Sequence, residues 1–261
     1  MEVVICPDAD RAQALTARLI AERLAAHPAS VLGLATGRTM EGVYARLAGM
    51  GASLSRATTF NLDEYVGVPP DDPRSYAAYM AEHLFSKTGA DPSRTHLPDG
   101  MADDLAAAAA DYEARIATAG GIDLQLLGIG STGHIGFNEP ISSLRSRTRD
   151  KLLTQATRDQ NAGMWGGDPD AVPKRAMTMG VGTILDASAL VLLGCGTAKA
   201  EVVAQAIEGP ITSRISASAI QMHNACTVIL DRDAAAALSG RAYYDFVTEN
   251  EPRWDAHRDL L

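Results

Sequence analysis

Short apolar runs rich in Val, Ile and Leu recur along the chain at residues 3–6, 31–35, 58–61, 124–129, 176–181, 190–193 and 226–230. Such runs are typical of strands that are buried on both faces of a parallel sheet. Helical patterns separate them, at residues 10–26, 40–48, 76–85, 103–118 and 198–207. The alternation predicts an α/β fold, a three-layer α/β/α sandwich with a mostly parallel, modified Rossmann-like central sheet.

The size and charge of the chain limit the classes of protein to which it can belong. Its 261 residues suit one domain over residues 1–261. The formal charge is −9, from 23 basic and 32 acidic residues, and no basic cluster indicates a nucleic-acid partner. No apolar run approaches the roughly 18 residues of a membrane helix, and the first residues lack the features of a signal peptide. We therefore expect a cytoplasmic protein without a membrane partner.

The three cysteines indicate free thiols. Cys6, Cys195 and Cys226 are an odd number and show no CxxC spacing. Cys6 and Cys226 lie in apolar runs, which favours burial in a reducing compartment over metal binding.

Several loops that follow strands are rich in glycine or polar residues. Because ligands of open parallel sheets bind outside the carboxyl ends of the strands, we expect the loops at 36–39, 62–67, 130–140 and 194–199 to gather at one edge. A further segment, 161–173, contains three glycines, two aspartates and two prolines. It predicts a long loop over a site.

Two of these loops have the form of anion sites. Thr36, Gly37, Arg38 and Thr39 follow a strand and open a helix, where free N–H groups, hydroxyls and a guanidinium can meet an anion. Lys199 follows a similar Gly-Cys-Gly-Thr turn and lies where a cation opposes the helix dipole. A plain capped turn and a solvated lysine are the alternatives.

Residues 128–140 follow a strand and place three glycines within residues 128–133, then His134 and Glu139. A histidine close to a carboxylate can transfer protons near neutral pH. Asp63 and Glu64 follow another strand, and a partly desolvated carboxylate there can act as a base. A surface histidine and solvated acidic residues are the alternatives.

These motifs together resemble the glucosamine-6-phosphate deaminase family. The resemblance rests on GIGSTGHIGFNEP at 128–140, FNLDEYVG at 60–67, LATGRT at 34–39, SSLRSRTR at 142–149 and MTMGVGTILDA at 177–187. The blocks occur in the family's order between about residue 30 and about residue 230.

The resemblance implies roles for individual residues. Asp63 matches the base that moves a proton between C2 and C1 of the open-chain sugar. His134 matches the ring-opening residue, and Glu139 matches the partner that orients it and favours its charged form. Contacts to a sugar-phosphate substrate are expected from eight further residues, namely Thr36, Gly37, Arg38, Thr39, Gly130, Thr132, Gly133 and Lys199. The chemistry implies no metal and no other cofactor.

Three positions depart from the family pattern. Thr132 stands where many members have an acidic or amide residue, so the ring-opening relay is expected to rest on His134 and Glu139 alone. Gly163 stands where the family has a substrate-binding arginine. Arg38 replaces the second glycine of a TGGT loop and is a candidate to supply the guanidinium lost at position 163.

The sequence favours isomerising deamination of an amino-sugar phosphate, with glucosamine 6-phosphate as the first candidate. Galactosamine 6-phosphate or a differently substituted amino sugar is an alternative substrate. A hydrolase similar to 6-phosphogluconolactonase and a non-catalytic sugar-phosphate sensor are further alternatives. Homo-oligomer formation and allosteric activation stay open.

Overall fold

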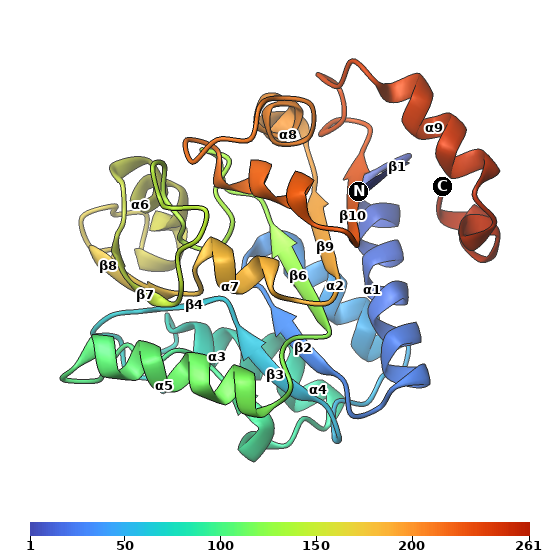
Figure 1. The fold of residues 1–261 in the computed structure, drawn as a ribbon. Coiled ribbons are helices and arrows are strands. Elements are labelled where there is room, and N and C mark those ends of the chain that lie inside the picture. Colours follow the sequence, from blue (N-terminus) through green and yellow to red (C-terminus); the bar gives the residue numbers. More distant parts are fainter.

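The computed structural model describes residues 1–261 and centres on a seven-stranded sheet (Figure 1). The strand order is β1-β10-β9-β6-β2-β3-β5, and all neighbouring pairs are parallel. The strands are β1 (Glu2–Cys6), β2 (Val31–Leu34), β3 (Thr58–Asn61), β5 (Thr95–His96), β6 (Leu124–Gly128), β9 (Leu190–Gly194) and β10 (Cys226–Asp231). The predicted parallel sheet is confirmed, with β5 as a short edge strand that its two-residue length hid from the sequence pattern.

Helices cover both faces of the sheet, which confirms the three-layer sandwich (Figure 1). Crossovers between parallel strands are right-handed. Connections that lead toward β5 therefore lie on one face of the sheet, and connections that lead back toward β1 lie on the other. The first face carries α1 (Ala9–Ala26), α2 (Arg38–Gly49), α3 (Tyr76–Met80) and α4 (Ser86–Thr88). The second carries α5 (Leu105–Thr118), α7 (Val181–Leu185), α8 (Ala200–Ile207) and the 3-10 helix Ser216–Met222.

The C-terminal part of the chain covers the free edge of β1. Helix α9 (Arg241–Asn250) packs beside this strand, and the Thr248 hydroxyl donates to the Val3 carbonyl at 3.4 Å. A 3-10 helix, Pro252–Leu260, follows and buries Trp254. Covering an edge strand in this way removes a template for unwanted strand pairing.

A second sheet lies apart from the first and corrects two sequence expectations. Its order is β4-β8-β7, with antiparallel pairs formed by β4 (Asp63–Tyr65), β7 (Arg149–Leu152) and β8 (Arg175–Thr178). Residues 62–67 were expected to be a loop, yet they contain β4. The run 176–181 was expected in the parallel sheet, but it supplies β8 and then α7. Apolar composition indicates that a strand is buried, but it does not indicate which other strand it pairs with.

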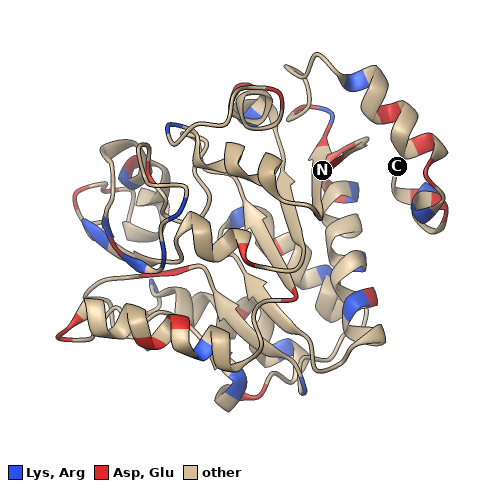
Figure 2. Cartoon of the chain, in the orientation of Figure 1, with Lys and Arg blue, Asp and Glu red and all other residues tan.

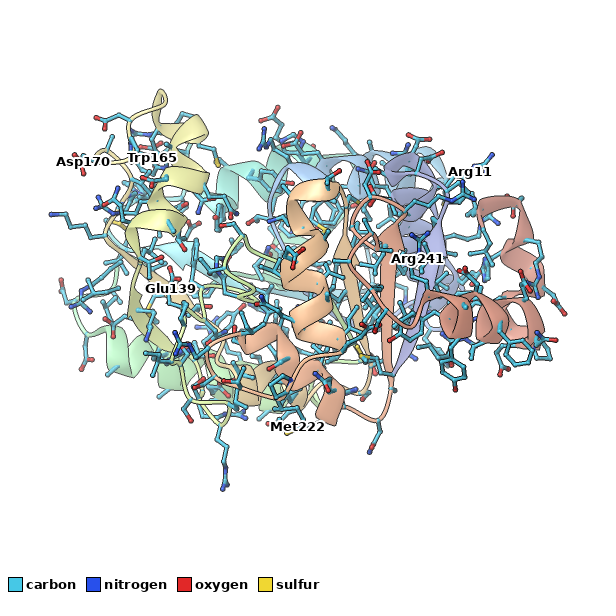
Figure 3. The ribbon with its side chains drawn as sticks, turned by 90° about the horizontal axis from the view of Figure 1, so that it is seen from above. Arg11, Glu139, Trp165, Asp170, Met222 and Arg241 are labelled. Atoms are coloured by element: carbon cyan, nitrogen blue, oxygen red, sulfur yellow. The ribbon has the colours of Figure 1, made fainter.

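Two further expectations are only partly right. The helix predicted at 76–85 is α3 followed by a π-helical turn, Ala81–Phe85. The loop predicted at 161–173 begins with the end of α6 (Gln155–Asn161) and a 3-10 turn, Ala162–Trp165. Figure 3 shows Trp165 and Asp170 together at one end of the molecule, where this segment lies.

Trp165 anchors this segment in a second apolar cluster. Its ring meets Tyr65 edge-on, with ring centroids 5.7 Å apart, and the Arg74 guanidinium lies 4.5 Å from the Trp165 ring on another side. Tyr76 and Phe137 stack in the same cluster. The aromatic contacts therefore tie residues 162–165 to β4 and to the turn after β6.

The main core is a cluster of 50 buried residues drawn from the sheet and its helices. Charged side chains lie mostly on the outer helices and loops, and the central strands are nearly free of them (Figure 2). Cys6 and Cys226 are buried free thiols. Among the helices, none is both long enough and apolar enough to cross a membrane. The interpretation of residues 1–261 as one domain stays a prediction.

Glu113 joins three elements near the small sheet. Its carboxylate accepts hydrogen bonds from the backbone N–H and hydroxyl of Thr148, from the Thr183 hydroxyl and from the Arg147 guanidinium. These bonds hold α5, the residues before β7 and α7 together, and they lower the pKa of Glu113 despite its burial.

Replacing Glu113 by alanine should therefore destabilise the protein. Without the carboxylate, several partly buried donors lose their acceptor. We therefore expect the free energy of unfolding to fall by about 2–4 kcal/mol. Chemical denaturation measures this value. Asp111→Ala on the same helix is the control, because it breaks an exposed pair with Arg115 and should cost less than about 1 kcal/mol. Equal losses in the two variants would contradict the role given to Glu113.

Candidate active site

A cavity of about 390 Å³ opens at the carboxyl edge of the parallel sheet. From β2 the chain continues to β3 on one side, and from β6 it continues toward β9 on the other. This reversal is the place where α/β sheets bind ligands. The cavity is lined by the loop after β2, by residues of the turn after β6, by the loop after β9 and by Asp63 after β3.

The loop after β2 is held rigidly beside the cavity. Gly37 has a φ of 116°, a conformation that favours glycine, and no side chain caps the start of α2. The hydroxyl of Tyr79 donates to the Gly37 carbonyl at 2.8 Å, and the hydroxyl of Tyr44 donates to the Ala35 carbonyl at 2.5 Å. The free N–H groups at the start of α2 are therefore fixed in one direction.

The loop after β9 has the same form. Gly196 has a φ of 87° and precedes the short 3-10 helix Thr197–Lys199, which leads into α8. The Asp231 carboxylate at the end of β10 accepts the Gly196 N–H at 2.9 Å. Each loop thus places a positive-φ glycine and a helical start at the sheet edge.

Arg38 and Lys199 bring two positive charges to this cavity from opposite loops. Neither side chain forms an ion pair or hydrogen bond with another residue of the chain. Burial lowers the pKa of Lys199, and the charge of Arg38 lowers it further. Two neighbouring cations without a carboxylate partner create a site for an anion from solution.

Asp63 faces the same cavity with its carboxylate nearly buried. The carboxylate makes no hydrogen bond within the chain. Burial, and then the nearby charge of Glu64, raise the pKa of Asp63 to about 8. A carboxyl group with such a pKa can exchange a proton near neutral pH.

Glu64 points away from the cavity and is bound by backbone groups. Its Oε1 accepts the N–H groups of Tyr65 at 2.8 Å and Tyr76 at 3.0 Å, and its Oε2 accepts that of Ala77 at 2.9 Å. The carboxylate thus joins β4 to the start of α3. This fixed charge stands directly beside the base candidate Asp63.

His134 packs against the turn that carries it. Its ring lies where a side chain at position 130 would be, so only glycine fits there. Its Nδ1 lies 2.8 Å from the Thr132 hydroxyl and 3.9 Å from Glu139 Oε2. Burial lowers the pKa of His134, and this outweighs the opposite effect of Glu139. One expectation needs correction: Glu139 is not the only partner beside the ring, because the Thr132 hydroxyl contacts the ring directly.

Glu139 is held by the segment that begins α6. Its Oε1 accepts the Thr154 N–H at 3.0 Å, and the Thr154 hydroxyl lies 3.2 Å from its Oε2. Thr154 is also the N-cap of α6 and accepts the Thr157 N–H. Glu139 therefore connects the turn after β6 with α6, and Figure 3 shows it between the outer segment of Trp165 and the centre of the molecule.

The chain was compared with known families and proteins. The family described as glucosamine-6-phosphate isomerases/6-phosphogluconolactonase matches residues 8–229. This chain belongs to that family. A glucosamine-6-phosphate deaminase of Rhodopirellula baltica is 51% identical over 247 residues, which are 93% of this chain and 98% of the relative. One of Hahella chejuensis is 46% identical over 251 residues, 95% of each chain.

Solved structures of the family have the same fold. A monomeric glucosamine-6-phosphate deaminase superposes with a TM-score of 0.88 at 43% identity, covering 91% of this chain and all of that one. A 6-phosphogluconolactonase from Leishmania guyanensis gives a TM-score of 0.70 at 20% identity, covering 89% and 97%. The second likeness shows the shared fold alone.

The structure gathers most residues that the sequence singled out. Those lining the cavity are Thr36, Gly37, Arg38, Thr39, Asp63, Gly130, His134 and Lys199. Thr132, Gly133 and Glu139 lie behind this lining. At Gly133 a side chain would collide with Ile215, and Glu139 contacts Thr154. The substrate contacts assigned to these residues stay predictions.

Three residues that line the cavity were not predicted from the sequence. Tyr76, Gln160 and Asn161 line the cavity from α3 and α6. Tyr76 lies in a segment predicted to be a helix, and Gln160 and Asn161 lie where the predicted loop begins. No local pattern marks them, because only the packing of α3 and α6 against the sheet edge brings them to the site.

Gly163 is exposed and lies outside the cavity lining, in the 3-10 turn after α6. A Cβ atom at this position would have no neighbour within 4 Å. A larger side chain would fit there without displacing others.

Asp63→Asn should stabilise the protein at high pH. The folded-state pKa of Asp63 lies above its unfolded value, so its charged form destabilises the fold as pH rises from about 4 to about 8. Asparagine removes that penalty. Since one pKa unit equals about 1.4 kcal/mol, we expect a gain of at least that amount at pH 9 and little at pH 4.

Chemical denaturation of both proteins at the two pH values measures the difference. Asp245→Asn replaces an exposed aspartate on α9 and should show no such trend. A gain for Asp63→Asn that does not grow with pH would contradict the raised pKa.

Proposed function

We propose that this chain is an enzyme that converts glucosamine 6-phosphate and water to fructose 6-phosphate and ammonia. The observation that carries the proposal is one cavity with two unpaired cations, a buried carboxylate of raised pKa and a neutral histidine. The curated relatives at 46–51% identity that carry the deaminase name support the same reaction.

The phosphate is bound by the loops after β2 and β9. The N–H groups at the start of α2, the hydroxyls of Thr36 and Thr39 and the charges of Arg38 and Lys199 are the donors. A phosphate dianion there would neutralise the two cations that the chain leaves unpaired. This contact fixes one end of the sugar and leaves C1 and C2 for the reacting groups.

Ring opening is assigned to His134. As a neutral base it takes the proton from O1, and it returns a proton to O5 as the C1–O5 bond breaks. The lowered pKa of His134 keeps the imidazole neutral and ready for the first transfer. The Thr132 hydroxyl at Nδ1 orients the ring so that Nε2 is the reacting nitrogen.

Isomerisation is assigned to Asp63. Its carboxylate removes the proton from C2 of the open-chain sugar, the C2–H electron pair forms the C1–C2 double bond of an enolamine, and O1 takes up a proton from solvent. Asp63 then returns its proton to C1, which leaves a protonated imine at C2. Water adds to that imine, and the C–N bond breaks to release ammonia and the ketose.

A substrate panel tests the proposal. We expect ammonia release with glucosamine 6-phosphate, at least a hundredfold less with unphosphorylated glucosamine, and no hydrolysis of a 6-phosphogluconolactone. A higher kcat/KM for galactosamine 6-phosphate would reassign the substrate to the C4 epimer, an alternative that the changes at positions 38 and 163 keep open. Sugar-phosphate binding without any ammonia release would favour the sensor.

His134→Gln should slow the reaction of the cyclic sugar by at least about a hundredfold, a usual contribution of general acid-base catalysis. An analogue that is already open should react at nearly the wild-type rate, because it bypasses ring opening. Steady-state kinetics with both substrates measures the split, and His27→Gln, at an exposed histidine, is the control. Equal slowing with both substrates would place His134 in the isomerisation step.

Arg38→Gly should raise KM for the phosphorylated sugar about ten- to a hundredfold, because one charge-assisted pair contributes roughly 1.5–3 kcal/mol. Adding Gly163→Arg in that background should recover part of the loss, since position 163 has space for a side chain. Arg56→Gly, at an exposed arginine away from the cavity, is the control. An unchanged KM in Arg38→Gly would mean that Arg38 does not bind the phosphate.

The cellular location, the partner and the oligomeric state of this protein are proposals. We propose a cytoplasmic enzyme whose partner is a small sugar phosphate. Formation of a homo-oligomer also stays a proposal, and the solved deaminase at 43% identity is described as monomeric.

A further inference from the structure

Gln160 connects α6 with the turn after β6. Its side-chain Oε1 accepts the N–H of Ser131 at 2.9 Å, across 29 positions of sequence. Ser131 directly follows Gly130, against which His134 packs, and both residues line the cavity. Gln160 lines the same cavity, and this bond joins its amide to the turn.

The bond to Ser131 determines which way the amide faces. A backbone N–H can only donate, so the atom of Gln160 that meets it is the carbonyl oxygen. The Nε2 group is therefore on the other side of the amide plane, and it has no acceptor within the chain. Two N–H donors are thus left free on a side chain that lines the cavity.

The strand order places this amide between the two basic loops. In the sheet, β6 lies between β9 and β2. The turn that carries Ser131 after β6 is therefore flanked by the loop of Lys199 on one side and the loop of Arg38 on the other. Gln160, which is bonded to that turn, lines the same cavity as Arg38 and Lys199.

We infer that Gln160 binds the phosphate of the substrate through Nε2 and thereby sets the preference for a phosphorylated sugar. This inference rests on the proposed function. Gly163, three positions further on, has no side chain that could reach the site. Gln160 thus supplies from α6 a neutral donor that complements the charges of Arg38 and Lys199.

Two substitutions separate binding from support of the turn. Gln160→Glu keeps an oxygen for the Ser131 N–H but replaces the donor group by a negative charge. Gln160→Ala removes both functions. If Nε2 binds the phosphate, KM should rise about tenfold in Gln160→Ala and about a hundredfold in Gln160→Glu, with kcat within about twofold of wild type.

Gln155→Glu is the matched control. Gln155 lies on the same helix, outside the cavity, and contacts Asp159 and Arg158. It receives the same change of charge and should leave KM unchanged. A rise in KM for Gln155→Glu equal to that for Gln160→Glu would overturn the inference, because a general charge effect would then explain both.

Binding of inorganic phosphate gives a second measurement that needs no turnover. Calorimetric titration should show weaker phosphate binding in both Gln160 variants, and weaker in Gln160→Glu than in Gln160→Ala. A Gln160→Glu protein with wild-type phosphate affinity and KM would overturn the inference, as would a loss confined to kcat. If the wild type binds phosphate but releases no ammonia, the proposed function fails, and the titration still decides the role of Gln160.

Discussion

The parallel register of β9, β6, β2 and β3 is the constraint on which the site depends. Backbone hydrogen bonds fix where each strand ends, so residues from four distant parts of the sequence meet at one edge. Asp63, His134, Arg38 and Lys199 owe their proximity to this register. The reversal of connections between β2 and β6 opens the space that a ligand needs. Helices on both faces then hold the strand ends in place.

The site keeps unlike charges in separate environments. Arg38 and Lys199 approach each other without a carboxylate, while Asp63 is buried without a cation. Either arrangement is unfavourable alone, because burial or repulsion penalises the charged form. The arrangement is consistent with a substrate that carries a dianion at one end and an exchangeable proton at the other. Burial raises the pKa of Asp63 most, and the neighbouring Glu64 carboxylate, held by three backbone N–H groups, raises it further.

The small antiparallel sheet and the aromatic cluster carry the outer wall of the cavity. Trp165, Tyr65, Tyr76 and Phe137 anchor residues 155–165, and Thr154 binds Glu139 at the start of α6. Through these contacts, α6 places Gln160 in the cavity lining, where it bonds Ser131 of the turn that carries His134.

The sequence by itself determined six of the seven strands of the main sheet, and the acidic, basic and imidazole groups in the segments that follow them. Apolar periodicity and glycine placement are local signals, and they report burial and backbone conformation directly. Tertiary structure alone decided that β8 pairs with β4 and β7, that the Thr132 hydroxyl lies closer to His134 than Glu139 does, and that Gln160 reaches the cavity. These outcomes depend on distances between side chains far apart in sequence. Such distances follow from the packing of α6 and the small sheet against the main sheet, and residue type and spacing do not encode that packing.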